Sequence, residues 1–229
     1  MTPKDAEATF VIIPAFNEER VIRSVVERVL TLGVHVVVVD DSSEDRTLEM
    51  IKDLPINILH HSINLGQGAA IQTGIDFALQ RGAKYLITFD ADGQHDEQDI
   101  PLLIDTLIQK HRDVVLGSRF LGTAINMSRS RRWLLKGAIL FTRLTLGLRL
   151  TDVHNGIRAF RSEAAKALRI SQNRMAHASE ILYKIKKAKL SFTEVPSTIR
   201  YTDYSKAKGQ STLGIIDILY DLFIRKLLR

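Results

Sequence analysis

The stretch YLITFDADGQHD, residues 85–96, joins a hydrophobic run of strand length to a cluster of oxygen-bearing side chains. Asp90 and Asp92 stand one residue apart at the end of the run, and Gln94 and His95 follow. In an open parallel sheet, ligands bind beyond the carboxyl ends of the strands. The stretch therefore predicts a buried strand of such a sheet, with a site at the edge where this strand ends.

The rest of the first half repeats the alternation of strand and helix. Further runs rich in Val and Ile, typical of buried strands, are FVIIPAF (10–16), VHVVVVDD (34–41), INILHHS (56–62) and DVVLGSR (113–119). Patterns typical of helices cover about residues 18–32, 44–53, 67–81 and 99–111. This alternation predicts an α/β fold with a Rossmann-like, mostly parallel central sheet and helices on both faces.

Polar side chains follow four of these strands. They are Asn17 and Glu18 after the first, Asp40 and Asp41 at the end of the second, the Asp90 and Asp92 pair, and Arg119 after the fifth. A single Asp at a strand end is often only the cap of the next helix. Because the carboxyl ends of parallel strands share one edge, four such ends indicate a binding site there.

Asp40 and Asp41 are placed to accept hydrogen bonds from the ribose or base of a nucleotide, as an acidic residue after a second parallel strand commonly does. The alternative is that they cap a helix over 44–53, a role that Ser42 or Ser43 could fill instead. We favour the nucleotide role because the residues share an edge with Asp90.

The second half is less regular. Residues 120–132 resemble a loop dense in Arg, and 133–150 form an apolar segment interrupted by cations. That segment is either a core helix with solvated cations or a helix that lies flat in a membrane interface. Helices near 162–169 and 176–188, strands within 191–201 and an amphipathic helix over 212–229 complete the chain.

Composition narrows the class of protein. The 229 residues are 45% hydrophobic and 25% charged, as expected for a globular domain. The absence of cysteine excludes disulfides, thiolate metal sites and a cysteine nucleophile, and it fits a reducing compartment. No run has the apolar length of a signal core or a spanning helix. We therefore expect a cytoplasmic protein that does not cross a membrane by itself.

The charge is divided unevenly along the chain. Residues 1–111 contain 9 Lys and Arg against 18 Asp and Glu, whereas residues 112–229 contain 23 against 8. The basic half is expected to meet an anionic partner, which could be nucleic acid, a phosphorylated ligand or a membrane surface.

The Asp90 and Asp92 pair predicts a divalent cation. Carboxylates in an Asp-x-Asp arrangement can reach one ion together, and hard oxygen ligands favour Mg²⁺ or Mn²⁺. Gln94 could supply a third, neutral oxygen, and the coordination positions left open suit phosphate oxygens. We expect His95 to be a solvated residue on a polar turn rather than a ligand.

Two other enzyme classes fit less well. Phosphatases of the haloacid dehalogenase type carry their acidic pair after the first strand, with a nucleophilic Asp, but here the pair follows the fourth strand. A nicotinamide enzyme requires a glycine-rich turn after the first strand, where this chain has PAFNEE.

With these motifs in hand, the chain resembles the family 2 inverting glycosyltransferases of GT-A fold, and especially the dolichyl-phosphate mannose synthase-like branch. The resemblance extends over about residues 10–214. It rests on VIIPAFNEE, VVVVDDSSEDRT, NLGQGAAIQTGI, FDADGQH, VLGSRF, TDVHNGIRAFR and VPSTIRYTDYSKAKGQST. The chain departs from the branch at Gln67, where Lys is common, at Asn155 and Ile157, where Ser and Phe are usual, and at Thr212.

The resemblance implies a set of donor-site residues. The nucleoside would lie against Pro14, Phe16, Glu18, Val39 and Asp41. The metal and diphosphate would lie against Asp90, Ala91, Asp92 and Gln94, with Arg119 and Lys206 near the phosphates. The implied organisation is one domain over 1–211, with a nucleotide-sugar half (8–119) and an acceptor half (120–211), followed by the terminal helix.

The resemblance also implies the reaction and its partners. An acceptor oxygen would attack the anomeric carbon of a nucleotide sugar of the GDP-mannose or UDP-glucose type, with inversion, while the metal, Arg119 and Lys206 stabilise the leaving group. For a polyprenyl phosphate acceptor, Arg129, Arg131 and Arg132 beside the apolar 133–150 segment would bind the phosphate. Peripheral contact with the cytoplasmic face of a membrane is expected, and a small membrane subunit is a possible partner.

Two alternatives are kept. Transfer to a sugar hydroxyl in a glycan requires a general base, for which Asp152 is the candidate, although Asp152 could simply anchor its loop. Glu180 could contact the donor sugar or be structural. The other alternative is a non-catalytic basic module, suggested by KIKKAK (184–189), but aromatic residues are sparse among the cations and no nucleic-acid partner is expected.

Overall fold

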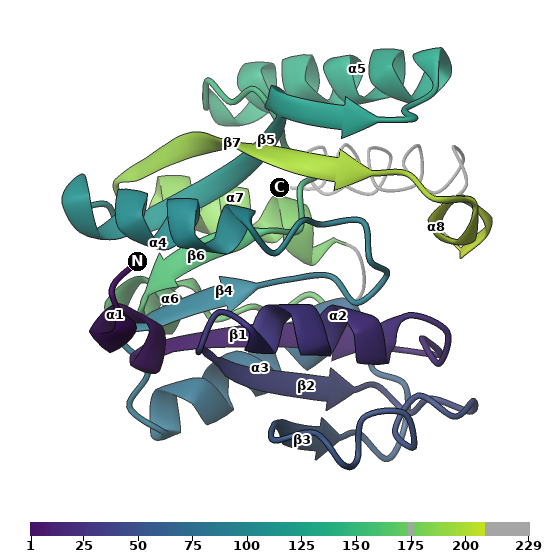
Figure 1. The fold of residues 1–229 in the computed structure, drawn as a ribbon. Coiled ribbons are helices and arrows are strands. Elements are labelled where there is room, and N and C mark those ends of the chain that lie inside the picture. The colour runs from purple at the N-terminus through teal and green to yellow at the C-terminus, as the bar shows by residue number, and fades with distance from the viewer. Residues whose placement is uncertain (174–175, 209–229) are drawn as a thin grey trace.

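The computed structural model describes residues 1–173 and 176–208, which form a seven-stranded sheet with helices on both faces (Figure 1). The predicted α/β class is confirmed. The strands are β1 (Thr9–Ala15), β2 (His35–Asp40), β3 (Asn57–His60), β4 (Tyr85–Thr88), β5 (Val114–Ile125), β6 (Arg158–Arg161) and β7 (Phe192–Arg200). The helices are α1 (Pro3–Glu7), α2 (Ile22–Leu30), α3 (Gln67–Gln80), α4 (Asp99–Gln109), α5 (Arg129–Leu146), α6 (Ser162–Leu168), α7 (His177–Lys187) and α8 (Asp203–Lys208).

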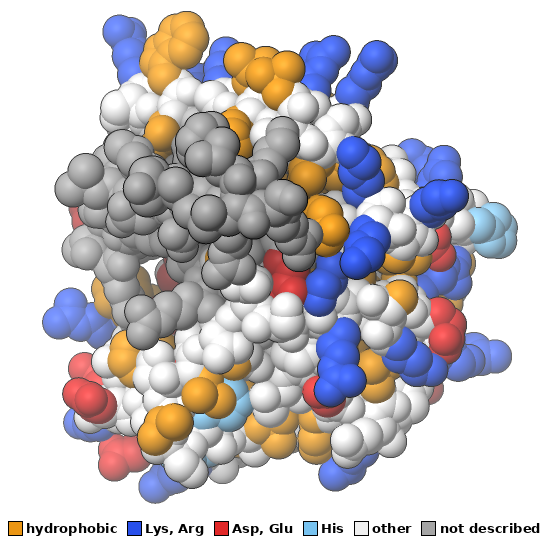
Figure 2. All heavy atoms as spheres, turned by 180° about the vertical axis from the view of Figure 1, so that it is seen from behind, with side chains coloured by type: hydrophobic (Ala, Val, Ile, Leu, Met, Phe, Trp, Pro, Cys, Tyr) orange, Lys and Arg blue, Asp and Glu red, His pale blue; other side chains and the backbone are white. Residues whose placement is uncertain are grey.

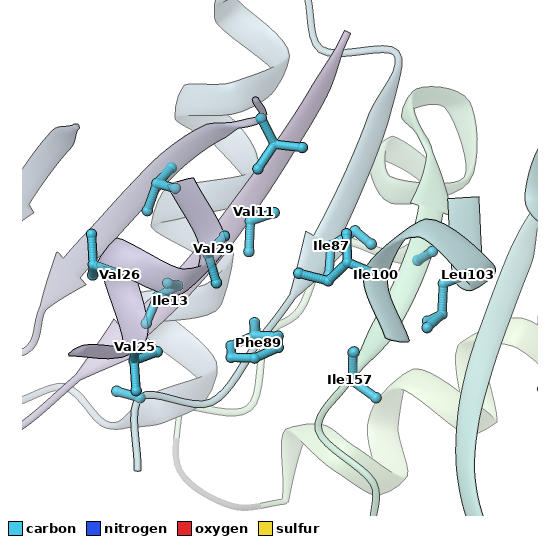
Figure 3. Packing of buried hydrophobic residues seen from close by; sticks show 14 of the residues in the cluster. Val11, Ile13, Val25, Val26, Val29, Ile87, Phe89, Ile100, Leu103 and Ile157 are labelled. Carbon is cyan, nitrogen blue, oxygen red and sulfur yellow. The ribbon is translucent and has the colours of Figure 1, made fainter. Parts of the chain in front are cut away.

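The sheet has the order β3-β2-β1-β4-β6-β5-β7, and its two faces carry separate cores. Every residue of β1 is buried. Val11 and Ile13 pack beneath α2 and α4 in one cluster, shown in Figure 3 with Phe89 and Leu103. The other cluster lies beneath α3, α6 and α7 on the opposite face. Burial on both faces explains why these strands are continuous hydrophobic runs rather than alternating ones.

The strand β6 is antiparallel to both of its neighbours, while the other pairs are parallel. Arg158, its first residue, pairs with Thr88 at the end of β4 and with Leu116 of β5. Because β6 runs the opposite way, its amino end lies at the edge where its neighbours have their carboxyl ends. The loop before β6 is thereby brought to the same edge as the Asp90 and Asp92 pair.

The predicted helix over 44–53 is wrong, because this segment forms a series of turns. Its polar side chains bond to backbone instead: Thr47 accepts from the amide of Glu18 at 2.7 Å, and Asp45 accepts from the amide of Glu19 at 3.1 Å. Side chains that satisfy nearby backbone in this way compete with helix formation. The capping role considered for Asp40 and Asp41 is therefore absent.

Two other predictions are corrected. The segment 120–132 is not a loop throughout, since β5 continues to Ile125 against β7, and α5 begins at Arg129 with Ser128 as its N-cap. The strand β3 is only half-buried at the sheet edge. The amphipathic helix predicted over 212–229 lies outside the described residues.

The helix α5 is not a core helix. Only Leu135 and Ala138 are buried, while Trp133, Leu140 and Leu144 are 73%, 57% and 75% exposed. Of the two interpretations of the 133–150 segment, the exposed face favours an interface. None of the helices within residues 1–173 and 176–208 has the length and hydrophobicity needed to span a membrane.

Candidate functional site

A cavity of about 410 Å³ opens at the carboxyl edge of the sheet. The residues that line it come from β1, β5, β6 and β7, from the loops after β1, β2 and β4, from the loop before β6 and from the amino-terminal parts of α3, α5 and α7. Of the residues proposed from the sequence, it is lined by Pro14, Phe16, Glu18, Asp41, Asp90, Ala91, Asp92, Gln94, Arg119 and Arg131. Segments that are far apart in the sequence therefore meet at the carboxyl edge of the sheet, where the sequence predicted a site.

Asp90 is held by side chains from two directions. His95 Nε2 lies 2.9 Å from Asp90 Oδ2, and Gln67 donates its amide to Asp90 Oδ1 at 2.9 Å. The expectation of a solvated His95 is wrong, since this residue is only 3% exposed, packs against Phe89 and bridges to Ile199 of β7. A histidine fixed in this way orients the carboxylate rather than meeting solvent.

Asp92 is bonded within its own turn. Its Oδ1 accepts from the amide of Gln94 at 3.0 Å, and its Oδ2 accepts from the Gln94 side chain at 2.6 Å. Gln94 thus contacts the acidic pair directly, as a donor to Asp92.

The pKa values of Asp90 and Asp92 are shifted in opposite directions. Burial and the neighbouring charge of Asp90 raise the pKa of Asp92 to about 6. Burial also opposes ionisation of Asp90, but the His95 hydrogen bond and the charges of His95, His177 and Arg158 outweigh it and lower the pKa of Asp90. A cation between the carboxylates would relieve the repulsion that raises the pKa of Asp92.

The donor set fits Mg²⁺ or Mn²⁺. The carboxylate oxygens are hard ligands, and each keeps a lone pair beyond its hydrogen bonds. No group of three or more His, Asp or Glu side chains in the described part of the chain is arranged to hold a metal ion. A cation at this pair would therefore take most of its remaining ligands from water or from a bound phosphate.

Asp41 also lines the cavity, and hydrogen bonds from several sides hold its carboxylate. Its carboxylate accepts from the backbone amides of Leu65 and Gly66 at 2.9 and 2.6 Å, and His61 Nδ1 lies 2.8 Å away. His61 is fixed in turn by Thr73 at 2.9 Å. The Asp41 carboxylate is thus oriented before any ligand binds.

The remaining nucleoside candidates differ in exposure. Phe16 is 40% exposed at the cavity, and Glu18 is buried, with Tyr204 of α8 donating to it at 2.8 Å. Val39 is fully buried in the core beside Gly74 and does not line the cavity. If Val39 contacts the nucleoside, it does so through its backbone, because its side chain is in the core.

Asp152 and Arg119 form a buried ion pair. Arg119 Nε lies 2.6 Å from Asp152 Oδ2, and the guanidinium also donates to Tyr201 at 2.6 Å and to the carbonyl of His154. Burial opposes the charge of Arg119, but Asp152 and Tyr201 outweigh it and raise its pKa. Asp152 itself does not line the cavity and accepts from the amides of Arg119 and His154. These contacts favour the anchoring role over the role of base.

The predicted basic residues are dispersed. Arg131 lines the cavity with its guanidinium 4.9 Å from the Tyr201 ring, whereas Arg129 and Arg132 are exposed on the first turn of α5 outside it. The side chain of Lys206 lies outside the described residues, although its backbone belongs to α8. Glu180 binds the amides of the 171–172 loop and Lys184, which is a structural role.

Several cavity residues were missed from the sequence: His154, Asn155, Gly156, Arg158, His177 and Ala178. Four of them belong to the segment TDVHNGIRAFR, which was noted as a motif without assigned contacts. The strand β6 is too short to give a recognisable pattern in the sequence. The residues of the loop before it could therefore not be placed at the carboxyl edge of the sheet.

Gly156 lies so close to Asp90 that a side chain would displace the carboxylate. A Cβ at Gly156 would be 2.1 Å from Asp90 Oδ2 and 2.6 Å from its Cγ. We expect Gly156→Ala to weaken Mg²⁺ or Mn²⁺ binding and turnover by about 10–100-fold, as loss of support for a metal ligand typically does. Titration calorimetry with the metal and a nucleoside diphosphate measures the change. Gly137→Ala on α5, where a Cβ meets nothing within 4 Å, is the control; equal binding by both variants would contradict the prediction.

The model of the family Glycosyl transferase family 2 matches residues 10–169. The UDP-N-acetylglucosamine–dolichyl-phosphate N-acetylglucosaminyltransferase of Methanococcus voltae is 33% identical over 240 residues, which cover 95% of this chain and 96% of that protein. The polyprenol monophosphomannose synthase of Mycolicibacterium smegmatis is 33% identical over 180 residues, 74% of this chain and 68% of that protein.

Solved structures share the fold. The glucosyl-3-phosphoglycerate synthase of Mycobacterium tuberculosis, in complex with Mn²⁺, UDP and phosphoglyceric acid, matches 96% of this chain and 79% of its own with a TM-score of 0.70. The sequences are 16% identical, so this likeness concerns the fold.

Proposed function

This chain belongs to glycosyl transferase family 2, and from that premise we propose that it moves a sugar from a nucleotide sugar to the phosphate of a polyprenyl phosphate. The chain is a glycosyltransferase of GT-A fold, as its motifs predicted. The observation that carries the proposal is the cavity, which is lined both by a half-buried carboxylate pair and by Arg131 of an exposed, partly apolar helix. The carboxylate pair suits a cation and the diphosphate that the cation would bind, and the arginine beside apolar side chains of α5 suits a phosphate on an apolar chain.

On the donor side, Asp90 and Asp92 would hold Mg²⁺ or Mn²⁺. When bound, the cation neutralises the charge that develops on the leaving diphosphate. His95 and Gln67 fix Asp90, so that its carboxylate needs no reorientation as this charge appears. Asp41, held by two backbone amides, would accept hydrogen bonds from the nucleoside, and the exposed ring of Phe16 would contact it.

On the acceptor side, a phosphate oxygen would attack the anomeric carbon opposite the diphosphate, forming one C–O bond as the other breaks, with inversion. A phosphate monoester is already ionised near neutral pH and needs no base. Asp152, the candidate base for a hydroxyl acceptor, is engaged by Arg119. This engagement supports a phosphate acceptor over a glycan hydroxyl.

The helix α5 would rest on the membrane that holds the lipid. Orange and blue side chains alternate along the upper edge of Figure 2, where Figure 1 places α5. The exposed residues Trp133, Leu140 and Leu144 stand among the cations Lys136 and Arg143 of the same helix. Such a mixture suits a monolayer surface, with apolar groups in the acyl boundary and cations at the headgroups.

The test of the function is a donor-by-acceptor assay. Labelled GDP-mannose, UDP-glucose and UDP-N-acetylglucosamine are each incubated with Mg²⁺ or Mn²⁺, with and without a polyprenyl phosphate, and the product is extracted into organic solvent. Label in the organic phase that requires both lipid and metal supports the proposal and identifies the sugar. Donor hydrolysis without lipid product would move the acceptor to a glycan hydroxyl.

Neutralising the basic start of α5 should affect the acceptor more than the donor. For Arg131→Gln with Arg132→Gln we expect the KM for polyprenyl phosphate to rise by about 10-fold or more, since hydrogen bonds to charged groups are worth about 1.5–3 kcal/mol. The KM for the nucleotide sugar should change less than threefold. Arg81→Gln, at the C-cap of α3 and outside the cavity, is the control. An equal rise in both KM values would count against an acceptor role.

The exposed leucines of α5 should control membrane binding. Leu140→Ser with Leu144→Ser is expected to lower partitioning onto vesicles of phosphatidylcholine and phosphatidylglycerol by about 10-fold or more, because burying each leucine contributes about 1.5–3 kcal/mol when complete. Sedimentation of the full chain with vesicles measures this. Leu102→Ser, at a 41% exposed position on α4, is the matched control; unchanged partitioning of the α5 variant would exclude this helix as the contact.

A further inference from the structure

Arg158 is brought to the cavity by the antiparallel direction of β6. It is the first residue of that strand and pairs with Thr88, two residues before Asp90. The loop that precedes it contributes Gly156, which packs against the Asp90 carboxylate. The topology therefore places a cation at the cavity, near Asp90.

The guanidinium of Arg158 is buried but only partly used. The residue is 4% exposed, and its Nε donates to the carbonyl of Asn155 at 3.1 Å. Within the described residues, its two terminal nitrogens have no hydrogen-bond acceptor, and neither is among the polar atoms sealed from solvent. Arg158 lines the cavity, so these nitrogens face the space where a ligand would lie.

The neighbouring carboxylates do not neutralise this cation directly. Asp152 is paired with Arg119, and Asp90 is bonded to His95 and Gln67. Burial lowers the pKa of Arg158 to about 10, while the charges of Asp90 and Asp152 oppose this effect. The group is therefore a cation at neutral pH, and the four N–H bonds of its terminal nitrogens donate to no residue in the described part of the chain.

We infer that Arg158 is a phosphate ligand of this enzyme, binding through the two terminal nitrogens of its guanidinium. This inference rests on the proposed function, in which the donor diphosphate and the acceptor phosphate meet in the cavity. A planar guanidinium matches two phosphate oxygens at once, which a solvent-exposed lysine does not. The phosphate belongs either to the donor diphosphate or to the lipid acceptor, and binding measurements separate the two sources.

The test uses the full chain with two substitutions at Arg158. Arg158→Gln removes the charge, and Arg158→Lys keeps the charge but removes the planar guanidinium that can donate two parallel hydrogen bonds. The dissociation constants for UDP, GDP, uridine and guanosine are measured with Mg²⁺, together with the KM for nucleotide sugar and for polyprenyl phosphate. Arg161→Gln is the control, because Arg161 lies on the same strand and donates to the carbonyls of Leu107 and Arg112.

If Arg158 contacts the donor, Arg158→Gln weakens the binding of UDP or GDP by about 10–100-fold and leaves the binding of uridine and guanosine unchanged. Arg158→Lys then weakens the binding of the diphosphate less. For an acceptor contact, the same loss falls on the KM for polyprenyl phosphate and leaves the nucleotide affinities unchanged. Either result supports the inference.

If every dissociation constant and KM value of the Arg158 variants stays within twofold of wild type, the inference is overturned. Arg158 would then only balance the negative charges of the neighbouring carboxylates. Equal weakening of nucleosides, diphosphates and lipid would also overturn it, because this result indicates a collapsed cavity. A wild-type chain that bound neither nucleotide nor lipid phosphate would overturn the proposed function as well, which separates the two failures.

Discussion

Asp92→Asn is expected to lower turnover by about 10²–10³-fold while leaving the fold intact, the cost of removing one preorganised electrostatic contact to a leaving group. The substitution keeps the size of the side chain and its place beside the Gln94 amide, but it removes one of the two charges proposed to hold the cation. The fold should tolerate it, because this removes a charge that burial and Asp90 disfavour. Activity against Mg²⁺ and Mn²⁺ concentration, with circular dichroism of the same sample, measures both effects.

The matched control is Asp96→Asn. Asp96 lies on the same loop, but its carboxylate pairs with Arg200 at 3.1 Å on the surface. Exposed ion pairs contribute little, so we expect nearly normal turnover and a stability change below about 1 kcal/mol. Full activity of the Asp92 variant, or an equal loss in both variants, would remove Asp92 from the metal site.

The acidic edge could be predicted because it depends on local sequence and one general rule. The runs that contain β1, β2 and β4 are long, apolar and followed by polar residues, and parallel strands bring such ends together. The resemblance then supplied Pro14 and Phe16, which a strand pattern alone does not single out. The structure places these residues around one cavity.

The rest depends on contacts between distant segments. His95 stands in a run of polar residues, and it is buried only because Ile199 of β7 and the Phe89 ring close over it. The strand β6 has four residues with Arg at each end, so no pattern shows that it enters the sheet in the reverse direction. The same reversal hides the placement of Arg158 from sequence reasoning.

Asp152→Asn separates the anchoring role from the role of base. Removing the charge would leave the Arg119 guanidinium, with its side chain 6% exposed, without its carboxylate. Breaking a buried pair from one side typically costs about 3–5 kcal/mol, so we expect the free energy of unfolding to fall by about 3 kcal/mol or more. Urea unfolding of wild type and variant measures this loss.

Glu194→Gln provides the comparison, because Glu194 is a carboxylate of β7 that accepts from the amides of Thr151 and Asp152 and from the Thr151 hydroxyl, and no cation of the described residues pairs with it. Its neutralisation leaves no unpaired charge, and because Gln keeps one acceptor oxygen we expect a smaller loss, on the order of 1.5 kcal/mol, the lower end for a hydrogen bond to a charged group. A larger loss for Asp152→Asn than for Glu194→Gln identifies the ion pair as the cause. Unchanged stability of Asp152→Asn, with a fall in kcat of about 10²–10⁴-fold, would instead indicate a general base and a hydroxyl acceptor. Asp152 and Glu194 belong to one hydrogen-bond network, because the Asp152 amide donates to the Glu194 carboxylate. The difference between the stability losses of the two variants therefore measures the effect of leaving Arg119 without its carboxylate.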